Sequence, residues 1–443
     1  MSALASQTTF LFRLVVGGLL LSAGSFAWAG PEVPGAPQQR PIALVGGMIV
    51  PVDGPTIEKG TVLFEDGKIT AVGKKVDLPD DVQVIDVTGK RVYPGLFESM
   101  SAMGLIEIDS IRASRDYAEV GELNPNVRAE KAVNPDSELI PVTRSNGVLL
   151  ALTAPKTGLL AGRSAVLQLD GWSTEDLTLQ ANVGLHLNWP AMSPIFEWES
   201  EKSAKEQVEA RDKMLRQLQL AFDEARAYQK LRAAEPTAPV DARLESLLPV
   251  LAGDIPVIVQ AEEVRQIQAA LAFVEREGLR MILYGGYDAE RCARLLKERQ
   301  IPVILGGVHR LPRRNDDDYD APFTLPARLH AAGVKFCIAG SGRFGASTAR
   351  NLPYHAATAV AYGLPADVAL EAITLAPAEI LGVADRVGSL TVGKDATLII
   401  TTGDPLETST AVEAAYIQGR RVDLSNRQQR LWKKYEQKYR QQR

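Results

Sequence analysis

The stretch Tyr93–Gly104 constrains the fold of this chain more than any other segment. It follows a β-rich run over residues 41–93 and opens a longer region in which apolar strands alternate with helical segments. Pro94 and Gly95 end the first pattern, because proline and glycine interrupt regular structure, and Leu96 then begins a buried strand. The chain therefore changes architecture here, from short strands to strand–helix units.

Several further runs predict a parallel α/β arrangement after this point. Apolar runs of the kind found in strands buried on both faces occupy residues 147–155, 164–169, 256–261, 279–286, 302–307 and 334–340. Helical segments separate the later runs, and residues 202–232 read as one long helix with a charged, solvated face. Strand–helix alternation at this spacing favours a parallel α/β barrel.

The first 29 residues have the features of a secretory signal peptide. Arg13 precedes an apolar run over residues 14–21, and Ala-Trp-Ala at residues 27–29 supplies a small-x-small cleavage pattern before Gly30. A membrane helix is the alternative, but the apolar run is interrupted by Gly and Ser and is shorter than the ~20 residues that span a bilayer. The sequence therefore predicts an exported protein, periplasmic or secreted, without a membrane span.

Length, charge and cysteine content narrow the class of protein. A chain of 443 residues is long enough for one barrel and a satellite domain. A formal net charge of −5 does not suggest a nucleic-acid partner. An exported protein with two cysteines could hold one disulfide. Cys292, however, falls in a predicted helix and Cys337 in a predicted core strand, so we expect two buried free thiols.

Both ends of the chain resemble the amidohydrolase superfamily, in its imidazolonepropionase- and dihydroorotase-like form. In that family Pro-Gly-Leu-Ile-Asp-x-His-x-His leads from a small β-sandwich into a metal-bearing barrel, and residues 94–104 are similar to it. Residues 387–400 are similar to the family's Gly-Ser-Leu-x-x-Gly-Lys-x-Ala-Asp-Leu segment. The resemblance covers residues 41–423 and implies an α/β fold, a (β/α)8 TIM-like barrel with a small composite β-sandwich made from both chain ends.

The resemblance also implies domain boundaries. They are a signal peptide over 1–29, a Pro/Gly linker over 30–40, the N-terminal part of the sandwich over 41–93, the barrel over 94–385, the C-terminal part of the sandwich over 386–423, and a basic C-terminal helix or tail over 424–443.

The family's metal ligands are absent from the positions that match its motifs. In the family, histidines on the first and later strands, a carboxylated lysine and a final aspartate supply the N and O donors that bind Zn²⁺ and lower the pKa of its water. Here Met100 and Ala102 occupy the first histidine positions, and Gln260 occupies a later one. Ser341 or Gly342 lies nearest the aspartate position. The sequence therefore predicts a degenerate site with no metal and no other cofactor.

Candidate pocket residues come from the carboxyl ends of the predicted strands, where barrel enzymes place their functional groups. They are Glu98, Lys156, Gln260, His309, Arg310 and Ser341. Glu98 is either a pocket carboxylate or a buried residue hydrogen-bonded to the hinge. Lys156 either meets an anionic ligand or is an ordinary loop lysine. The sequence leaves both alternatives open.

Other polar segments have less specific patterns. Residues 310–320 combine arginines with four aspartates but lack the spacing of a calcium loop, so we expect internal ion pairs there. His186 reads as a packed, hydrogen-bonded histidine. In the basic tail, Trp432, Tyr435 and Tyr439 fall on one helical face. That tail is a helix packed on the barrel, a frayed end, or a contact for a partner subunit or an anionic membrane surface.

Two functions from different classes follow. The chain is either a non-catalytic or impaired family member, a pseudoenzyme that binds a small-molecule ligand or pairs with a catalytically competent paralogous subunit. Or it is an active hydrolase that acts on C–N bonds of cyclic amides or small peptides with an unusual site. The missing ligands favour the first, since a fold by itself does not determine a function.

Overall fold

The computed structural model describes residues 33–194, 202–340 and 345–442. The description below concerns the compact unit Val33–Arg443. The predicted signal peptide and the predicted pocket residue Ser341 lie outside the described residues. Within the described part, no helix combines the length and apolarity needed to cross a bilayer.

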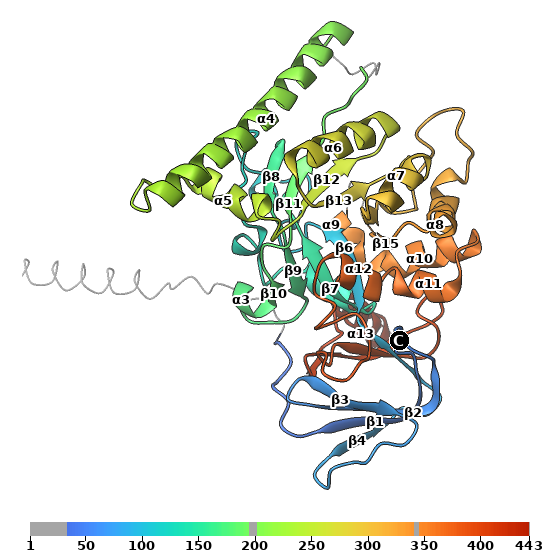
Figure 1. The fold of residues 1–443 in the computed structure, drawn as a ribbon. Helices are drawn as coiled ribbons and strands as arrows, with labels where there is room; N and C mark the ends of the chain where they lie inside the picture. Colours follow the sequence, from blue (N-terminus) through green and yellow to red (C-terminus); the bar gives the residue numbers. More distant parts are fainter. Residues whose placement is uncertain (1–32, 195–201, 341–344, 443) are drawn as a thin grey trace, which may run out of the picture. The chain divides into compact units, whose positions relative to one another are not determined.

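Strands from both ends of the chain form one eight-stranded sheet (Figure 1). The strand order is β18-β17-β16-β5-β1-β2-β3, with β4 paired to β1. The strands are β1 Ile42–Ile49, β2 Ile57–Glu65, β3 Lys68–Gly73, β4 Gln83–Asp86, β5 Arg91–Pro94, β16 Leu398–Thr401, β17 Val412–Ile417 and β18 Arg420–Val422. β16 runs antiparallel to β5, with Leu398 opposite Pro94. The strands from before and after the strand–helix region therefore meet in one sheet.

The turn between β2 and β3 shows why this sheet folds locally. Asp66 and Gly67 have φ values of 49° and 76°. Two consecutive residues with positive φ give the tight hairpin turn that matches the twist of antiparallel strands, and Asp-Gly is a preferred pair for it. The interior of the sheet includes Phe64 and Tyr416, whose rings meet edge-on with centroids 5.2 Å apart.

The strand–helix region contains two further sheets. One has six strands in the order β15-β14-β13-β12-β11-β8, and the other has four in the order β10-β9-β7-β6. The strands are β6 Leu96–Ser101, β7 Val148–Thr153, β8 Leu160–Arg163, β9 Ala165–Gln168, β10 Thr178–Gln180, β11 Leu185–Asn188, β12 Val257–Ala261, β13 Met281–Gly285, β14 Val303–Leu305 and β15 Phe336–Ile338. The five strands β11–β15 are parallel.

The uniformly parallel arrangement expected from the sequence is wrong for two strands. β8 pairs antiparallel with β11, and β9 pairs antiparallel with β7. β8 and β9 are consecutive and flank Ser164, so this one segment contributes a strand to each sheet. At the other edge, Gly340 follows β15 and donates its backbone N–H to the Glu98 carboxyl group of β6, at 2.9 and 3.1 Å.

Helices separate the strands along the chain (Figure 1). The α-helices are α2 Leu139–Arg144, α3 Thr174–Leu177, α4 Ala204–Ala234, α5 Ala242–Leu251, α6 Val264–Glu277, α7 Ala293–Glu298, α8 Ala321–Ala332, α9 Gly345–Thr348, α10 Leu352–Ala361, α11 Ala366–Glu371, α12 Leu375–Ile380 and α13 Arg427–Gln441. Short 3-10 helices are η1 Arg112–Ser114, η2 Ala129–Lys131, η3 Ala289–Cys292 and η4 Ala349–Asn351.

Helix α4 confirms the long helix expected over 202–232. Ser203 and Glu206 form a capping box at its start, which satisfies backbone N–H groups that have no partner within the helix. Phe222 of α4 contacts Phe273 of α6 with ring centroids 5.6 Å apart. The amphipathic pattern of the sequence therefore fixes which side of α4 is buried.

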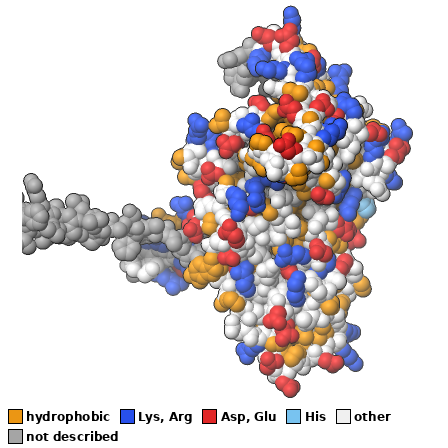
Figure 2. Space-filling model, turned by 60° about the vertical axis from the view of Figure 1, so that its left-hand side comes forward, with side chains coloured by type: hydrophobic (Ala, Val, Ile, Leu, Met, Phe, Trp, Pro, Cys, Tyr) orange, Lys and Arg blue, Asp and Glu red, His pale blue; other side chains and the backbone are white. Residues whose placement is uncertain are grey.

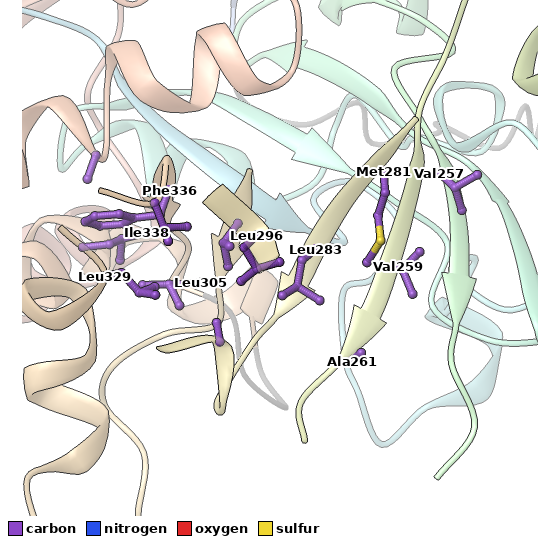
Figure 3. Packing of buried hydrophobic residues seen from close by; sticks show 14 of the residues in the cluster. Val257, Val259, Ala261, Met281, Leu283, Leu296, Leu305, Leu329, Phe336 and Ile338 are labelled. Atoms are coloured by element: carbon purple, nitrogen blue, oxygen red, sulfur yellow. The ribbon is translucent and has the colours of Figure 1, made fainter. Parts of the chain in front are cut away.

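The central strands bury side chains on both faces, which explains their continuous apolar sequences. One face packs against the helices, and its cluster includes Val257, Val259, Leu283, Leu296 and Leu329 (Figure 3). Alternate residues of the same strands face a second cluster, which includes Phe97, Met100, Ile258, Ile282, Ile304 and Cys337. Both cysteines are free and buried, as the sequence predicts.

Candidate functional site

A cavity of about 610 Å³ lies at the carboxyl ends of the parallel strands. Its wall includes Asn188 at the end of β11, Gln260 of β12 and Tyr284 of β13. These three residues are direct neighbours across the sheet, because Asn188 pairs with Gln260 and Gln260 with Tyr284. The strand register therefore aligns one row of polar side chains along the cavity wall.

Four of the six residues predicted from the sequence line this cavity. They are Lys156, Gln260, His309 and Arg310. Glu98 is not among the lining residues, and Ser341 is outside the described part of the chain. The four come from segments far apart in sequence, and the parallel sheet brings them together because the carboxyl ends of its strands share one edge.

Lys156 and Arg115 supply positive charge to the cavity. The Lys156 ammonium lies 5.3 Å from the centroid of the Tyr117 ring. The side chain is open to the cavity, yet desolvation by the surrounding wall lowers its pKa, an effect that Asp109 opposes. Within the described residues, neither cation has an ion-pair partner. This part of the wall therefore presents cations that a bound anion could neutralise.

Gln260 and His186 add uncharged polar groups. Gln260 is the one exposed residue in an otherwise buried strand, and its side-chain amide has no hydrogen-bond partner within the described residues. His186 is only 6% exposed, and burial lowers its pKa to about 3, so that the imidazole is neutral. The expectation that His186 is packed holds, but its Nε2 has no hydrogen-bond partner in the described part of the protein.

His309 and Arg310 are held in place by neighbouring side chains. The His309 ring stacks on His355 at 4.0 Å, and its Nε2 lies 2.8 Å from the Thr358 hydroxyl. Burial lowers the pKa of His309. Arg310 forms an ion pair with Glu262 at 3.3 Å. These two residues are therefore fixed parts of the wall, and the charge of Arg310 is already balanced.

Among the described residues, the arginine- and aspartate-rich loop forms one internal ion pair, Arg314 with Asp317, and its other ion pairs reach residues outside 310–320. Arg314 contacts Asp288 at 2.6 Å and Asp317 at 3.1 Å. Arg310 and Arg314 also lie over the Tyr287 ring, at 4.9 and 5.4 Å from its centroid. These contacts hold the loop against Asp288 and the Tyr287 ring.

Glu98 occupies the second of its two predicted positions, buried beside the hinge. It is fully buried and accepts hydrogen bonds from the backbone N–H groups of Gly340 and Met100. Burial raises its pKa from 4.5 to about 8, although these two N–H groups act in the opposite direction. Glu98 is therefore a protonated acid at neutral pH, and its hydrogen bonds join β6 to the segment after β15. Although it was among the predicted pocket residues, it does not line the cavity.

The residues at the family's metal positions do not fit Zn²⁺. Met100 lines the cavity with a thioether, whereas Ala102 is fully buried in a separate cluster with Met103 and Leu105. Protein Zn²⁺ sites use thiolate, imidazole and carboxylate ligands, almost always three or four together. The described residues contain no group of three or more His, Cys, Asp or Glu arranged to hold a metal ion.

Sequence reasoning missed the residues that come from the loop after β6. Asp109, Arg115 and Tyr117 belong to this loop and line the cavity. Glu262, directly after β12, also lines it. Loops that follow barrel strands carry functional residues as often as the strand ends do. The charged residues between β6 and α2 were therefore the signal that could have identified Arg115.

The fold is mixed α/β, with a cavity at the carboxyl ends of its parallel strands, and known proteins share this fold. The family model described as "Amidohydrolase family" matches residues 264–422. Amidohydrolase tasK from Hapsidospora irregularis is 24% identical over 434 residues, which cover 88% of this chain. The chain spans 42% of the length of that curated relative.

Solved structures show the same fold. An amidohydrolase from Thermotoga maritima MSB8 is 24% identical, with a TM-score of 0.76 and coverage of 86% of this chain and 99% of that one. A prolidase complexed with N-methylphosphonate-L-proline is 18% identical, with a TM-score of 0.52 and coverage of 86% and 99%. The chain is therefore similar to amidohydrolases in sequence and shares the fold of solved ones.

Proposed function

We propose that this chain is an exported, non-catalytic amidohydrolase-superfamily protein that binds a small anionic ligand at the carboxyl ends of its parallel strands. The observation that carries the proposal is which side chains occupy the motif's metal-ligand positions and which cations share their cavity. Met100 and Gln260 stand where the family's motif has imidazoles, while Lys156 and Arg115 face the same space without ion-pair partners in the described residues.

The charge of the wall supports an anionic ligand. Partial desolvation disfavours the charged form of Lys156, and an opposite charge nearby would compensate for that cost. Arg115 adds a planar guanidinium suited to bidentate contacts with a carboxylate or phosphate. A cavity of about 610 Å³ lies within the range typical of small-molecule sites.

Two uncharged groups support specific recognition. The Gln260 amide can donate and accept hydrogen bonds, and the neutral His186 ring has an unpartnered Nε2 in the described part of the chain. A buried polar atom without a partner costs about 1–3 kcal/mol. A ligand that supplies the missing hydrogen bond would therefore be favoured over one that carries only charge.

The second candidate is an active hydrolase of C–N bonds in small amides or peptides. Its similarity to amidohydrolases favours it, as does the fold shared with a prolidase whose solved complex contains a proline phosphonate. Asp109 and Glu262 are cavity carboxylates that could act as a general base on water. Turnover of Xaa-Pro dipeptides or cyclic amides that is lost in an Asp109→Asn or Glu262→Gln variant would favour this candidate.

Fold closure and assembly form part of the same proposal. We infer that β6, β7, the β8–β9 segment and β11–β15 close into an eight-stranded barrel, and that the sheet from both chain ends is the composite sandwich. The Ser164 junction and the Glu98–Gly340 hydrogen bonds support closure, because each connects the edges of the two sheets.

A catalytically competent paralogue is the partner we propose if the chain acts as a subunit.

Export is proposed from the first 29 residues alone. Cleavage after residue 29 would leave Gly30 as the first residue of the mature protein. N-terminal sequencing of protein recovered from the producing cell is the measurement. An intact Met1 on the cytoplasmic protein would contradict export.

Isothermal titration tests the ligand class. We expect small carboxylates or phosphates to bind and their neutral amides to bind weakly. Lys156→Gln should weaken binding by about tenfold or more, since it removes a cation from the site. Lys213→Gln on the exposed side of α4 is the matched control and should leave affinity unchanged. Equal binding of anions and neutral amides by the parent protein would overturn the proposal.

A further inference from the structure

The C-terminal helix α13 exposes aromatic side chains that the rest of the protein does not cover. No residue of α13 is buried. The exposed fractions are 42% for Leu431, 63% for Trp432, 50% for Tyr435 and 60% for Tyr439. Large aromatic side chains are normally at least half buried, so four apolar groups exposed on one short helix indicate a surface with a binding role.

These four residues share one side of the helix. At 100° per residue, Leu431, Tyr435, Tyr439 and Trp432 fall within an arc of about 100°. The remaining circumference carries the basic residues Arg427, Arg430, Lys433, Lys434, Lys438 and Arg440. The Lys438 ammonium borders the aromatic side, 5.8 Å from the Tyr435 ring centroid and 5.9 Å from that of Tyr439. The helix is therefore strongly amphipathic, with cations beside and opposite an aromatic stripe.

Among the described residues, the hydrogen bonds and ion pairs that join α13 to the rest of the protein come from the start of the helix. Asn426, the N-cap, donates its side-chain amide to the Ser145 hydroxyl at 2.9 Å. Arg430 forms a bidentate pair with Glu138, both distances being 2.9 Å. Beyond Arg430 the side chains of the described helix are exposed, apart from the half-buried Glu436. The first turn thus fixes the helix in place and leaves the aromatic stripe open.

Charge is segregated between this segment and the rest of the chain. Residues 427–443 contain seven Lys or Arg and one Glu, so the formal net charge of −5 divides into +6 for this segment and −11 for all other residues. Elsewhere acidic and basic side chains are interspersed, as on the face shown in Figure 2. An anionic surface would therefore attract the helix and repel the remainder of the molecule.

We propose that α13 docks this protein on an anionic phospholipid surface, with the aromatic stripe in the interface and the basic side chains on the lipid phosphates. Trp and Tyr favour the headgroup region of a bilayer, because their rings are apolar and their N–H or O–H groups remain hydrated. Lys and Arg near such a surface contribute further attraction, and their long apolar stems can lie along it.

The residue types favour lipid over the other occupants of an exposed helix face. A second copy of α13 would place like charges side by side. An acidic protein partner would also match the basic residues, so the composition of the apolar side of the helix decides between the two occupants. Here one Leu accompanies three amphipathic aromatic residues, which is the composition of a helix that lies in a membrane interface.

Vesicle co-sedimentation with the full chain tests the proposal. The parent protein should sediment with vesicles of phosphatidylglycerol and phosphatidylethanolamine, and much less with phosphatidylcholine alone. The variant Lys433→Gln/Lys434→Gln/Lys438→Gln should lower the partition coefficient roughly 10- to 100-fold, and added salt should weaken the parent's binding in the same direction.

Aromatic variants separate this helix from non-specific adsorption. Trp432→Ser/Tyr439→Ser should reduce binding about tenfold or more, because interfacial binding scales with the apolar surface inserted. The matched control is Trp172→Ser/Tyr319→Ser, which removes a Trp and a Tyr of similar exposure, 68% and 75%, from other parts of the surface. It should bind like the parent.

Two results would overturn the proposal. In the first, the parent does not sediment with phosphatidylglycerol vesicles; if it then forms oligomers in sedimentation velocity that the lysine variant abolishes, α13 binds the acidic surface of a second copy. In the second, the α13 variants sediment as well as the parent. The ligand titration above is independent of both.

Discussion

Replacing Glu98 with glutamine should change the pH dependence of stability in a direction fixed by the structure. Glu98 is fully buried, and burial raises its pKa from 4.5 to about 8. In the unfolded chain the carboxyl group ionises above its ordinary pKa, whereas in the folded chain it stays protonated until about pH 8. Between these values the folded state binds more protons, so the stability of the parent falls as pH rises.

The magnitude follows from the same two pKa values. Each pH unit between about 4.5 and 8 lowers the free energy of unfolding of the parent by roughly 1.4 kcal/mol. The total loss is about 3 kcal/mol at pH 7 and about 5 kcal/mol above pH 8. A glutamine side chain at this position does not ionise and avoids this cost. Its amide oxygen can accept hydrogen bonds from the backbone N–H groups of Met100 and Gly340. Its NH2 group, however, faces the Gly340 N–H, and two donors facing each other lower the free energy of unfolding by about 1–3 kcal/mol at every pH.

Urea unfolding of Glu98→Gln and the parent from pH 5 to pH 9 measures the difference. The free energy of unfolding of the variant, relative to the parent, should rise with pH up to about pH 8 and then level off. Glu175→Gln is the control, because that side chain is 70% exposed, and its difference should stay flat. A flat or falling difference for Glu98→Gln would show that the buried carboxyl is ionised in the native state and refute the reasoning.

Two further substitutions test the cavity wall and the buried ion pairs. Met100→His/Ala102→His should destabilise the protein by a few kcal/mol, since it leaves ring nitrogens unpaired and overpacks the fully buried Ala102 position, and Zn²⁺ should not restore the melting temperature. A rise of several degrees with Zn²⁺ would reveal a metal site. Asp170→Asn should cost about 3–5 kcal/mol in urea unfolding, because Arg144, paired at 2.8 Å and 4% exposed, would keep a buried charge. A loss below about 1 kcal/mol, the value expected of an exposed pair, would contradict this.

Local sequence patterns predicted the type of the longer elements of the fold, but not the short strands β8, β10 and β11. The junction between β5 and β6 was predictable because Pro94 and Gly95 end one strand pattern. Gly95 is also required sterically, since a Cβ there would lie 2.9 Å from the Leu149 side chain. The antiparallel direction of β8 and β9 could not be predicted. Strand direction depends on which neighbours are free to pair, and the local apolar pattern is the same in either direction.

The candidate site was predictable where position along a strand determines it. Lys156 and Gln260 were found because each lies at or just after the end of a strand. Which of its two predicted positions Glu98 takes could not be predicted, because β6 pairs with β7 through register shifts on both sides of Phe97 and Glu98. These shifts break the alternation that assigns a side chain to one face. Arg115 was missed because its place in the cavity depends on the path of a loop.

The most direct test of the account is the metal content of the purified protein. Met100, Ala102 and Gln260 supply a thioether, a methyl group and an amide where the family's motif has imidazoles, so the account predicts no stoichiometric transition metal by elemental mass spectrometry after dialysis. One Zn²⁺ per chain that survives dialysis would contradict it and would return the protein to the metal-dependent hydrolases.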